Sequence, residues 1–419
     1  MNVFDEWPQL DDDIQALIPE IISIRHHLHQ YPELSNREFE TSRFIAEKLE
    51  SYGIPFQSGI AGTGIMAVLN SERPGICRVF RAELDALPLT EQTLLPYASK
   101  MRACYPVTGG GEEETGVMHA CGHDMHMAMV LGFARLVATH PEKFTGSFKF
   151  LFQPAEEGAP DGENSGARQM IKEGVLESPV PDVCIGLHVT AGPLGEFRLG
   201  RHRTTASADT FRLEISGKST HAAFPWTGID PVPVAAQIIS AWQTIPTRQV
   251  NLSQSMPPVI TVGRIYGGQR HNILADNVIL EGTVRTVDNQ QRDFVLARMA
   301  DISQGLATCV GASTKLTLSS NNYIAGKNDS ALVESIVPLL SKISSHQVTV
   351  DGGTYGTDDF AEYAQRVSGL FIRMGASPPE MTSTGEYIWP THSDKFIADD
   401  RAIAIGIKMF SILSLHLKK

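Results

Sequence analysis

Ser147-Phe148-Lys149-Phe150-Leu151-Phe152 is a short run rich in aromatic residues, and Gln153-Pro154-Ala155-Glu156-Glu157 follows it directly. Aromatic residues in a run of this length predict a β-strand, and the Gln-Pro-Ala segment predicts a loop. In open α/β sheets, binding sites lie at the carboxyl ends of the strands. The stretch therefore predicts an α/β fold whose functional site includes the adjacent carboxylates Glu156 and Glu157.

Strands, loops and helices alternate on both sides of this stretch. Further strands are expected near residues 65–69, 77–84 and 183–187, and helices near residues 11–30, 36–52, 124–139, 167–173, 331–343 and 401–417. For the second of these helices, Asn36 is the expected N-cap and Gly53 the closing residue. The alternation predicts a mostly parallel sheet flanked by helices on both faces.

The pattern changes at about residue 204. Long alternating strands, such as those at 211–215 and 278–285, are separated by helices in the order strand, helix, strand, strand, helix, strand. This order predicts an α+β domain inserted into the first domain. We expect a catalytic, metal-binding domain at 1–203 and 319–419, with a lid or dimerisation domain at 204–318. An exposed strand edge in the inserted domain favours a homodimer.

Composition and charge argue against several classes of protein. The chain of 419 residues has a formal net charge of −12 and no run rich in lysine and arginine, which disfavours nucleic acid and anionic membranes as partners. Its five cysteines are odd in number and widely spread, unlike a secreted disulfide framework. No apolar run is long enough to span a membrane, and the acidic N-terminus does not resemble a leader. We expect a soluble, cytoplasmic protein.

Four segments carry side chains that bind metals. They contain Cys121-Gly122-His123-Asp124, the pair Glu156-Glu157, His188 and His392. Thiolate, imidazole and carboxylate groups recruited from distant segments are typical of a catalytic metal site on an α/β scaffold, whereas structural zinc fingers use close Cys/His pairs. In the Glu-Glu pair, one carboxylate can bind metal while its neighbour acts as general base. The set predicts a two-metal hydrolase.

Other histidines and the cysteine admit different interpretations. Cys121 with His123 could instead form a thiol nucleophile, and a metal-binding protein without activity is a further alternative. His126, one turn into its helix, is more typical of a packed residue than of a ligand. The cluster His26-His27-Leu28-His29 is best explained as a solvated helix surface. Taken alone, His221 and Asn272 in the inserted domain are weak candidates for contact with a substrate.

These segments together resemble a known family, the di-metal amidohydrolases that include hippurate hydrolase, bacterial aminoacylases and plant indole-acetyl-amino-acid hydrolases. The resemblance spans nearly the whole chain. It rests on the motifs His29-Gln30-Tyr31-Pro32-Glu33-Leu34-Ser35 with Glu38, Arg81-Ala82-Glu83-Leu84-Asp85-Ala86-Leu87-Pro88, Met118-His119-Ala120-Cys121-Gly122-His123-Asp124, Gln153-Pro154-Ala155-Glu156-Glu157-Gly158, Gly186-Leu187-His188 and His221-Ala222-Ala223.

The resemblance implies specific roles for these residues. Two divalent metals would be held by a set of five ligands: Cys121, His123, Glu157, His188 and His392. Glu156 would be the general base, and Asp85 would support the site. His221 and Asn272 would contact the substrate and the oxyanion. Two positions depart from the family: Glu83 stands where an aspartate is usual, and Trp226 stands where a histidine is frequent, which favours a flat or apolar acyl group.

The expected reaction is hydrolysis of the amide bond of an N-acyl amino acid. A water activated by two metals would lose its proton to Glu156, and the leaving amine would then receive that proton. A thiolate ligand suits zinc, although manganese, nickel and cobalt are also compatible with the set. A dipeptidase, or a deacylase of the N-acetyl-diaminopimelate type, would use the same site, and the sequence does not separate these substrates.

Overall fold

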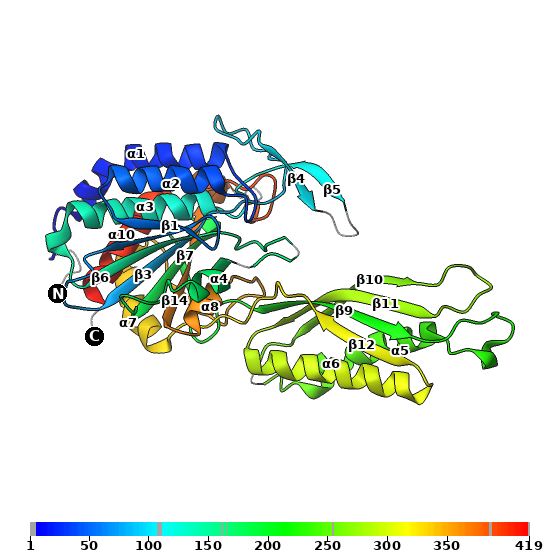
Figure 1. The fold of residues 1–419 in the computed structure, drawn as a ribbon. Coiled ribbons are helices and arrows are strands. Elements are labelled where there is room, and N and C mark those ends of the chain that lie inside the picture. The colour runs from blue at the N-terminus through cyan, green and yellow to red at the C-terminus, as the bar shows by residue number, and fades with distance from the viewer. Residues whose placement is uncertain are drawn as a thin grey trace. The chain divides into compact units, whose positions relative to one another are not determined.

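The computed structural model describes residues 6–106, 111–160, 162–164, 166–253, 255–384 and 388–417. The chain forms two compact units, one of residues 1–202, 327–352 and 362–419, and one of residues 203–326 and 353–361 (Figure 1). The second unit extends beyond residue 318, since Ala208 N–H donates to the carbonyl of Tyr323. It also takes in residues 353–361, because Thr354 N–H donates to the carbonyl of Thr204.

The first unit is built on an eight-stranded sheet with the order β1-β2-β6-β3-β7-β14-β8-β13. Strands β6, β3, β7 and β14 run parallel, whereas β1, β2 and β8 have antiparallel neighbours. The sheet is therefore mostly parallel, as predicted. Its strands are β1 Phe56–Ile60, β2 Gly64–Leu69, β3 Cys77–Glu83, β6 Ser147–Gln153, β7 Val183–Pro193, β8 Phe197–Gly200, β13 Thr349–Asp351 and β14 Ser368–Ser377.

Helices flank this sheet. Helix α3 packs against β3, β6 and β7, and α1 and α10 pack against α3 in turn, so that α1 and α3 lie side by side above the sheet in Figure 1. The helices that lie wholly in this unit are α1 Leu10–Gln30, α2 Phe39–Ser51, α3 His123–Thr139, α4 Gly166–Lys172, α7 Ser330–Ile343, α9 Pro379–Thr384 and α10 Arg401–His416. A short helix, α8 Phe360–Ala364, crosses the point where the chain returns to the first unit.

Aromatic packing fixes the centre of the first unit. Every residue of β3 and β6 is buried. Phe80 on β3 meets Phe133 on α3 at a ring-centroid distance of 4.8 Å and Phe410 on α10 at 5.1 Å, both in edge-to-face geometry. Burying one such ring contributes about 2–3 kcal/mol, and a favourable aromatic pair adds about 1 kcal/mol. The strands that lead to the site therefore have rigid support.

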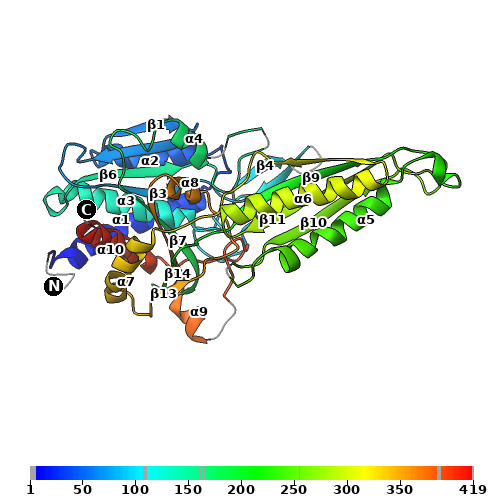
Figure 2. The ribbon, with the colours of Figure 1, turned by 90° about the horizontal axis from the view of Figure 1, so that it is seen from below.

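The second unit is a four-stranded antiparallel sheet with the order β10-β11-β9-β12. Helices α5 and α6 pack side by side on this sheet (Figure 2). Each helix begins at an aspartate N-cap, Asp230 for α5 and Asp288 for α6. The predicted order of strands and helices is confirmed by β9 Ser207–Ser216, α5 Pro231–Trp242, β10 Val259–Gly267, β11 Asn277–Thr286, α6 Asn289–Cys309 and β12 Ser313–Leu318.

The predicted start of one helix was wrong. Helix α2 begins at Phe39, because Asn36 adopts a positive φ of 59° and its N–H donates to the buried Glu38 carboxylate. A hairpin of β4 Arg102–Pro106 and β5 Glu112–Gly116 was not predicted.

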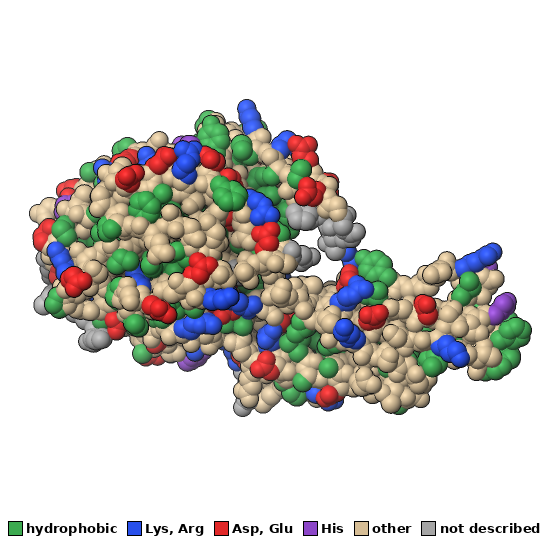
Figure 3. Space-filling model, in the orientation of Figure 1, with side chains coloured by type: hydrophobic (Ala, Val, Ile, Leu, Met, Phe, Trp, Pro, Cys, Tyr) green, Lys and Arg blue, Asp and Glu red, His purple; other side chains and the backbone are tan. Residues whose placement is uncertain are grey.

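No helix among the described residues is long and apolar enough to cross a membrane. The face in Figure 3 shows acidic and basic side chains intermixed.

Candidate metal centre

The candidate residues gather where the central parallel strands end. Glu156 and Glu157 follow β6, and His188 lies within β7. Cys121 and His123 flank Gly122, the N-cap of α3, whose φ of 86° turns the chain into the helix. The loop with His392 joins them, because its backbone N–H donates to the carbonyl of Ala120 at 2.8 Å. Four distant segments thus meet at one edge of the sheet.

Short distances connect the five side chains that the sequence predicts as ligands. The sulfur of Cys121 lies 3.4 Å from His188 Nε2 and 3.3 Å from His392 Nε2. Glu157 Oε1 lies 3.3 Å from His392 Nε2 and 3.9 Å from His123 Nε2. Cys121 belongs to two groups whose ligand atoms all lie within 4.8 Å of one another, one with His123 and His188 and one with Glu157 and His392. Cys121 therefore belongs to both of these groups that could hold a cation.

The donor atoms of this cluster fit a metal. His123 Nδ1 donates to the carbonyl of Asp85 at 2.7 Å, and His188 Nδ1 donates to the carbonyl of Val189 at 2.7 Å. Each ring therefore turns the lone pair of Nε2 toward the cluster. Among the described residues, His123 Nε2 is buried without a hydrogen-bond partner. A buried polar atom of this kind is costly unless a ligand satisfies it.

The charges of the cluster also favour a cation. Burial raises the pKa of the Cys121 thiol well above its ordinary value, and Glu157 and Glu156 raise that pKa further. Burial lowers the pKa of His123, but Glu83, Asp85 and Glu157 outweigh this and raise it to about 10. A divalent cation would relieve the crowding of negative charge and stabilise the thiolate. Without such a charge, Cys121 stays a thiol, which disfavours the thiol-nucleophile interpretation.

The general-base candidate lies on the same edge. Glu156 is buried, and its Oε2 is 3.8 Å from His123 Nε2. The turn that presents it is fixed by two acidic residues: Glu38 Oε1 accepts from Ala155 N–H and Asp85 Oδ2 accepts from Glu157 N–H, each at 2.9 Å. Sequence reasoning gave Asp85 a supporting role but assigned none to Glu38, whose place five residues after the Glu33-Leu34 motif was the available signal.

One histidine was misjudged. His29 is buried, with Nδ1 2.9 Å from Asp124 Oδ2 and Nε2 3.1 Å from Glu91 Oε1, so the prediction of a solvated surface was wrong for it. Arg25 Nε donates to the same Asp124 oxygen at 2.8 Å. Arg25 and His29 are four residues apart on one helix face, and this spacing was a usable signal. The pair anchors the start of α3 beside His123.

The prediction for His126 is confirmed. This residue is packed, with Nδ1 2.8 Å from Glu83 Oε2, while Nε2 accepts from Val189 N–H at 2.9 Å. Glu83, His123 and His126 also form a close group of possible ligands. Because both nitrogens of His126 have protein partners, we do not assign a metal to that group.

The two substrate-contact candidates lie in the second unit. Ala222 N–H donates to the carbonyl of Asn272 at 3.1 Å, so the segments that carry His221 and Asn272 are neighbours. His221 is exposed, with Nδ1 accepting from Ala223 N–H at 3.0 Å. Trp226 is 77% exposed nearby in sequence. Contact of these residues with a substrate stays a prediction.

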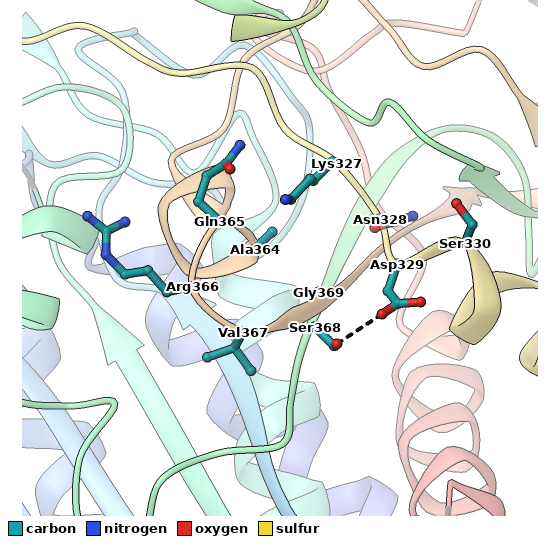
Figure 4. A pocket seen from close by; sticks show the side chains of 10 residues that line it. All are labelled: Lys327, Asn328, Asp329, Ser330, Ala364, Gln365, Arg366, Val367, Ser368 and Gly369. Atoms are coloured by element: carbon teal, nitrogen blue, oxygen red, sulfur yellow. Dashed lines mark hydrogen bonds between the residues drawn. The ribbon is translucent and has the colours of Figure 1, made fainter.

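A surface pocket of about 420 Å³ in the first unit lies elsewhere (Figure 4). It is lined by residues 327–330 and 364–369, with Asp329 accepting from the Ser368 hydroxyl at 2.9 Å. Ser368 begins β14 and pairs in register with Val183, whereas His188 pairs with Arg373 further along the two strands. The pocket therefore lies near the strand ends opposite the metal-ligand cluster.

Known proteins resemble this chain over most of its length. It is 36% identical to the N-acetyl-L-cysteine deacetylase of Bacillus subtilis over 93% of this chain and 86% of the relative. It is 36% identical to the N-acyl-L-amino acid amidohydrolase of Geobacillus stearothermophilus over 74% of this chain and 77% of the relative. A dinuclear metal-binding M20 peptidase from Bacillus subtilis has a similar structure, with a TM-score of 0.77 and 29% identity over 96% of this chain and 98% of that one.

A family model extends the same likeness across both units. The model for peptidase family M20/M25/M40 matches residues 79–414, which include every residue of the cluster described above. The acidic, thiol and imidazole groups at the strand ends agree with the metal-binding nature of the structural relative. The chain belongs to peptidase family M20/M25/M40 and is a hydrolase of amide bonds.

Proposed function

We propose that this enzyme hydrolyses the amide bond of N-acyl amino acids at the cluster of Cys121, His123, Glu157, His188 and His392. The observation that carries the proposal is the pair of adjacent carboxylates, of which we propose Glu157 as a metal ligand and Glu156 as the general base. Both carboxylates lie near His123 Nε2, Glu156 Oε2 at 3.8 Å and Glu157 Oε1 at 3.9 Å, and Glu157 Oε1 also lies 3.3 Å from His392 Nε2 in a group with Cys121. Relatives named as deacetylases and amidohydrolases of acylated amino acids support the choice of substrate.

The residues of the chain divide the steps of the reaction. Two divalent cations, when bound, supply Lewis acidity that lowers the pKa of a water and polarises the substrate carbonyl. Glu156 takes a proton from that water as the oxygen attacks the carbonyl carbon, and it then delivers the proton to the amine nitrogen as the C–N bond breaks. The products are a carboxylic acid and a free amino acid. His221 donates to the developing oxyanion, a contribution of about 3 kcal/mol for one such donor.

Zinc is the metal we propose, because Cys121 supplies a thiolate and three imidazoles complete a borderline-soft set. Manganese, nickel and cobalt are the alternatives, since Glu157 also suits harder cations. Reconstitution of metal-free protein with each ion, followed by measurement of bound metal per chain and of activity, tests this choice. Preference for an ion that thiolates bind poorly, such as magnesium, would contradict the assignment.

A substrate panel tests the proposed reaction. Acetyl, benzoyl and indole-acetyl amino acids, dipeptides and N-acetyl-diaminopimelate are incubated with the metal-loaded enzyme, and amine release is measured. We expect N-acyl amino acids to give the highest kcat/KM. Faster cleavage of dipeptides would reassign the enzyme as a dipeptidase, and preference for the diaminopimelate compound would reassign it to that deacylase class. No release from any of them would overturn the proposal.

Assembly and location belong to the same proposal. The edge strand β10 exposes Val259, Ile265 and Tyr266, and such an edge favours pairing with a second copy. We propose a homodimer, which light scattering with size-exclusion chromatography tests. A cytoplasmic location accords with five free cysteines, and cell fractionation tests it.

A further inference from the structure

We propose that His126 is a positioning residue that fixes the orientation of His188 through the backbone N–H of Val189. This inference rests on the proposed metal-binding function and adds a residue that the cluster of five does not contain. His126 contributes no ligand atom in this proposal. Its role is to hold the strand segment that carries a ligand.

The need for such a residue arises where β3 ends. Strand β3 pairs with β7 only as far as Arg81 opposite Gly186, although β7 continues to Pro193. On its other side β7 remains paired with β14 beyond His188. Val189 N–H therefore has no strand partner on the β3 side, and it donates to His126 Nε2 at 2.9 Å. The His126 imidazole thus supplies the acceptor that a strand neighbour would otherwise provide for Val189 N–H.

The proton on His126 is fixed by this bond. Because Nε2 accepts from a backbone N–H, the ring proton is on Nδ1, and it is donated to Glu83 Oε2 at 2.8 Å. The other oxygen of Glu83 accepts from the Arg81 guanidinium, and Arg81 Nε donates to Gln153 Oε1 at 2.9 Å. All four side chains are almost completely buried. A paired and desolvated network of this kind has one favourable arrangement.

The same residue, Val189, also orients His188 through its carbonyl, which belongs to the next peptide group. This carbonyl accepts from His188 Nδ1 at 2.7 Å, which leaves His188 Nε2 facing Cys121 Sγ at 3.4 Å. The backbone of Val189 thus forms two hydrogen bonds with imidazoles, one from its N–H to His126 and one from His188 to its carbonyl oxygen. The centroids of the His126 and His188 rings are 4.8 Å apart, and the rings pack edge to face, so His126 also limits rotation of the His188 ring. Loss of the His126 bond would free this orientation.

Glutamine and asparagine separate the two bonds of His126. The amide oxygen of glutamine reaches as far as Nε2 and can accept from Val189 N–H, whereas the amide nitrogen of asparagine reaches only as far as Nδ1 and can donate to Glu83. His126→Gln therefore keeps the bond that matters here, and His126→Asn loses it. His346→Gln, at an exposed histidine, is the control for the loss of an imidazole.

The experiment measures the zinc dissociation constant of each full-length variant by competition with a chromogenic chelator. The cobalt-loaded proteins are compared through their thiolate charge-transfer absorption, and circular dichroism checks the fold. We expect His126→Asn to weaken zinc binding 10- to 100-fold, as is typical for loss of a partner of a metal-ligating histidine, and to alter the cobalt spectrum. The zinc dissociation constant of His126→Gln is expected to lie within about threefold of that of the unaltered enzyme, which is a smaller change than the one expected for His126→Asn. His346→Gln should match the unaltered enzyme.

Each result decides between separate claims. Equal zinc affinity in His126→Asn and the unaltered enzyme would overturn the positioning role alone, as would equal weakening in the Asn and Gln variants. Absence of zinc binding by the unaltered protein would overturn the metal centre itself. Should His126→Asn fail to fold, nitrogen NMR of histidine-labelled enzyme still decides: a proton on His126 Nδ1 supports the proposal, and a proton on Nε2 overturns it.

Discussion

At the scale of single residues, neighbouring carboxylates differ in what surrounds them. Glu157 lies in the ligand group, its N–H is bound by Asp85, and its Oε1 is near His392. Glu156 is one position away and faces His123. A change at Glu156 should therefore affect the proton transfer without removing a ligand, whereas a change at Glu157 should affect metal binding.

Glu156→Gln tests this division. The amide cannot take a proton, so kcat should fall by about 10²–10⁴, the usual contribution of a general base. Metal content by atomic spectroscopy should remain at the level of the unaltered enzyme. Glu142→Gln, at an exposed carboxylate, is the control and should change neither quantity. Turnover near normal in Glu156→Gln would refute its role as base.

Glu38 provides a pH-dependent test at the same scale. Burial, and then the charge of Asp85, raise the pKa of Glu38 to about 7. An acid whose folded pKa is raised contributes its stability below its unfolded pKa of about 4.5, and that stability is lost as the pH rises through about 7. Glu38→Gln keeps an acceptor for Ala155 N–H without the ionisation.

The free energy of unfolding of Glu38→Gln, measured in urea, is compared with that of the unaltered protein. The difference between them should shift in favour of the variant by about 3 kcal/mol from pH 4 to pH 8. Glu38→Ala, in contrast, leaves the buried Ala155 N–H unpaired and should cost about 1–3 kcal/mol at both pH values. A constant difference between Glu38→Gln and the unaltered protein across this range would show that Glu38 does not ionise there.

At the scale of elements, the sequence predicted what depends on local pattern. The apolar run at 147–152 and the alternation around it identified β6 and its neighbours, because both are periodic features of adjacent residues. The start of α2 could not be read in this way. Asn36 has the local preference of an N-cap, but Glu38 draws its N–H into a buried network that includes Thr63 and Ala155. Such distant partners override local preference.

The candidate site followed the same division. Cys121, His123, Glu157, His188 and His392 were visible because their chemistry is unusual and because strand ends are where sites form. His29 and Glu38 were missed, since their roles depend on Asp124 and Ala155, which are distant in sequence. Sequence thus indicated the groups that we propose as metal ligands, while the contacts of His29 and Glu38 required the structure.

The N-terminus of α3 allows a prediction about an element. Gly122 has a positive φ, and a Cβ atom there would come within 2.4 Å of the Val189 side chain. Gly122→Ala should therefore weaken zinc binding and destabilise the fold by about 1–3 kcal/mol. Gly53→Ala is a matched control, because Gly53 has a φ of 68° but no neighbour within 4 Å. Zinc titration and urea unfolding measure both. Equal effects of the two changes would mean that backbone strain, not contact with Val189, limits position 122.

At the scale of the whole molecule, every proposed ligand lies in the first unit, in segments 121–123, 156–157, 188 and 392. A metal that binds only the folded form stabilises it by mass action, by about 4 kcal/mol at a concentration a thousand times the dissociation constant. This stabilisation should be confined to the unit that contains the ligands. The four-stranded sheet of the second unit has its own hydrophobic core and no proposed ligand.

Chelation of the metal should therefore abolish activity and affect the two units differently. Hydrogen exchange followed by mass spectrometry should show faster exchange in peptides that contain Cys121, His188 and His392 after chelation, because those segments lose their common anchor. Peptides from β9 and β11 should exchange at unchanged rates. Addition of zinc should restore slow exchange and activity together. An equal increase in exchange rate in both units would contradict confinement of the metal to the first unit. Activity that survives complete chelation would support the thiol of Cys121 as the nucleophile.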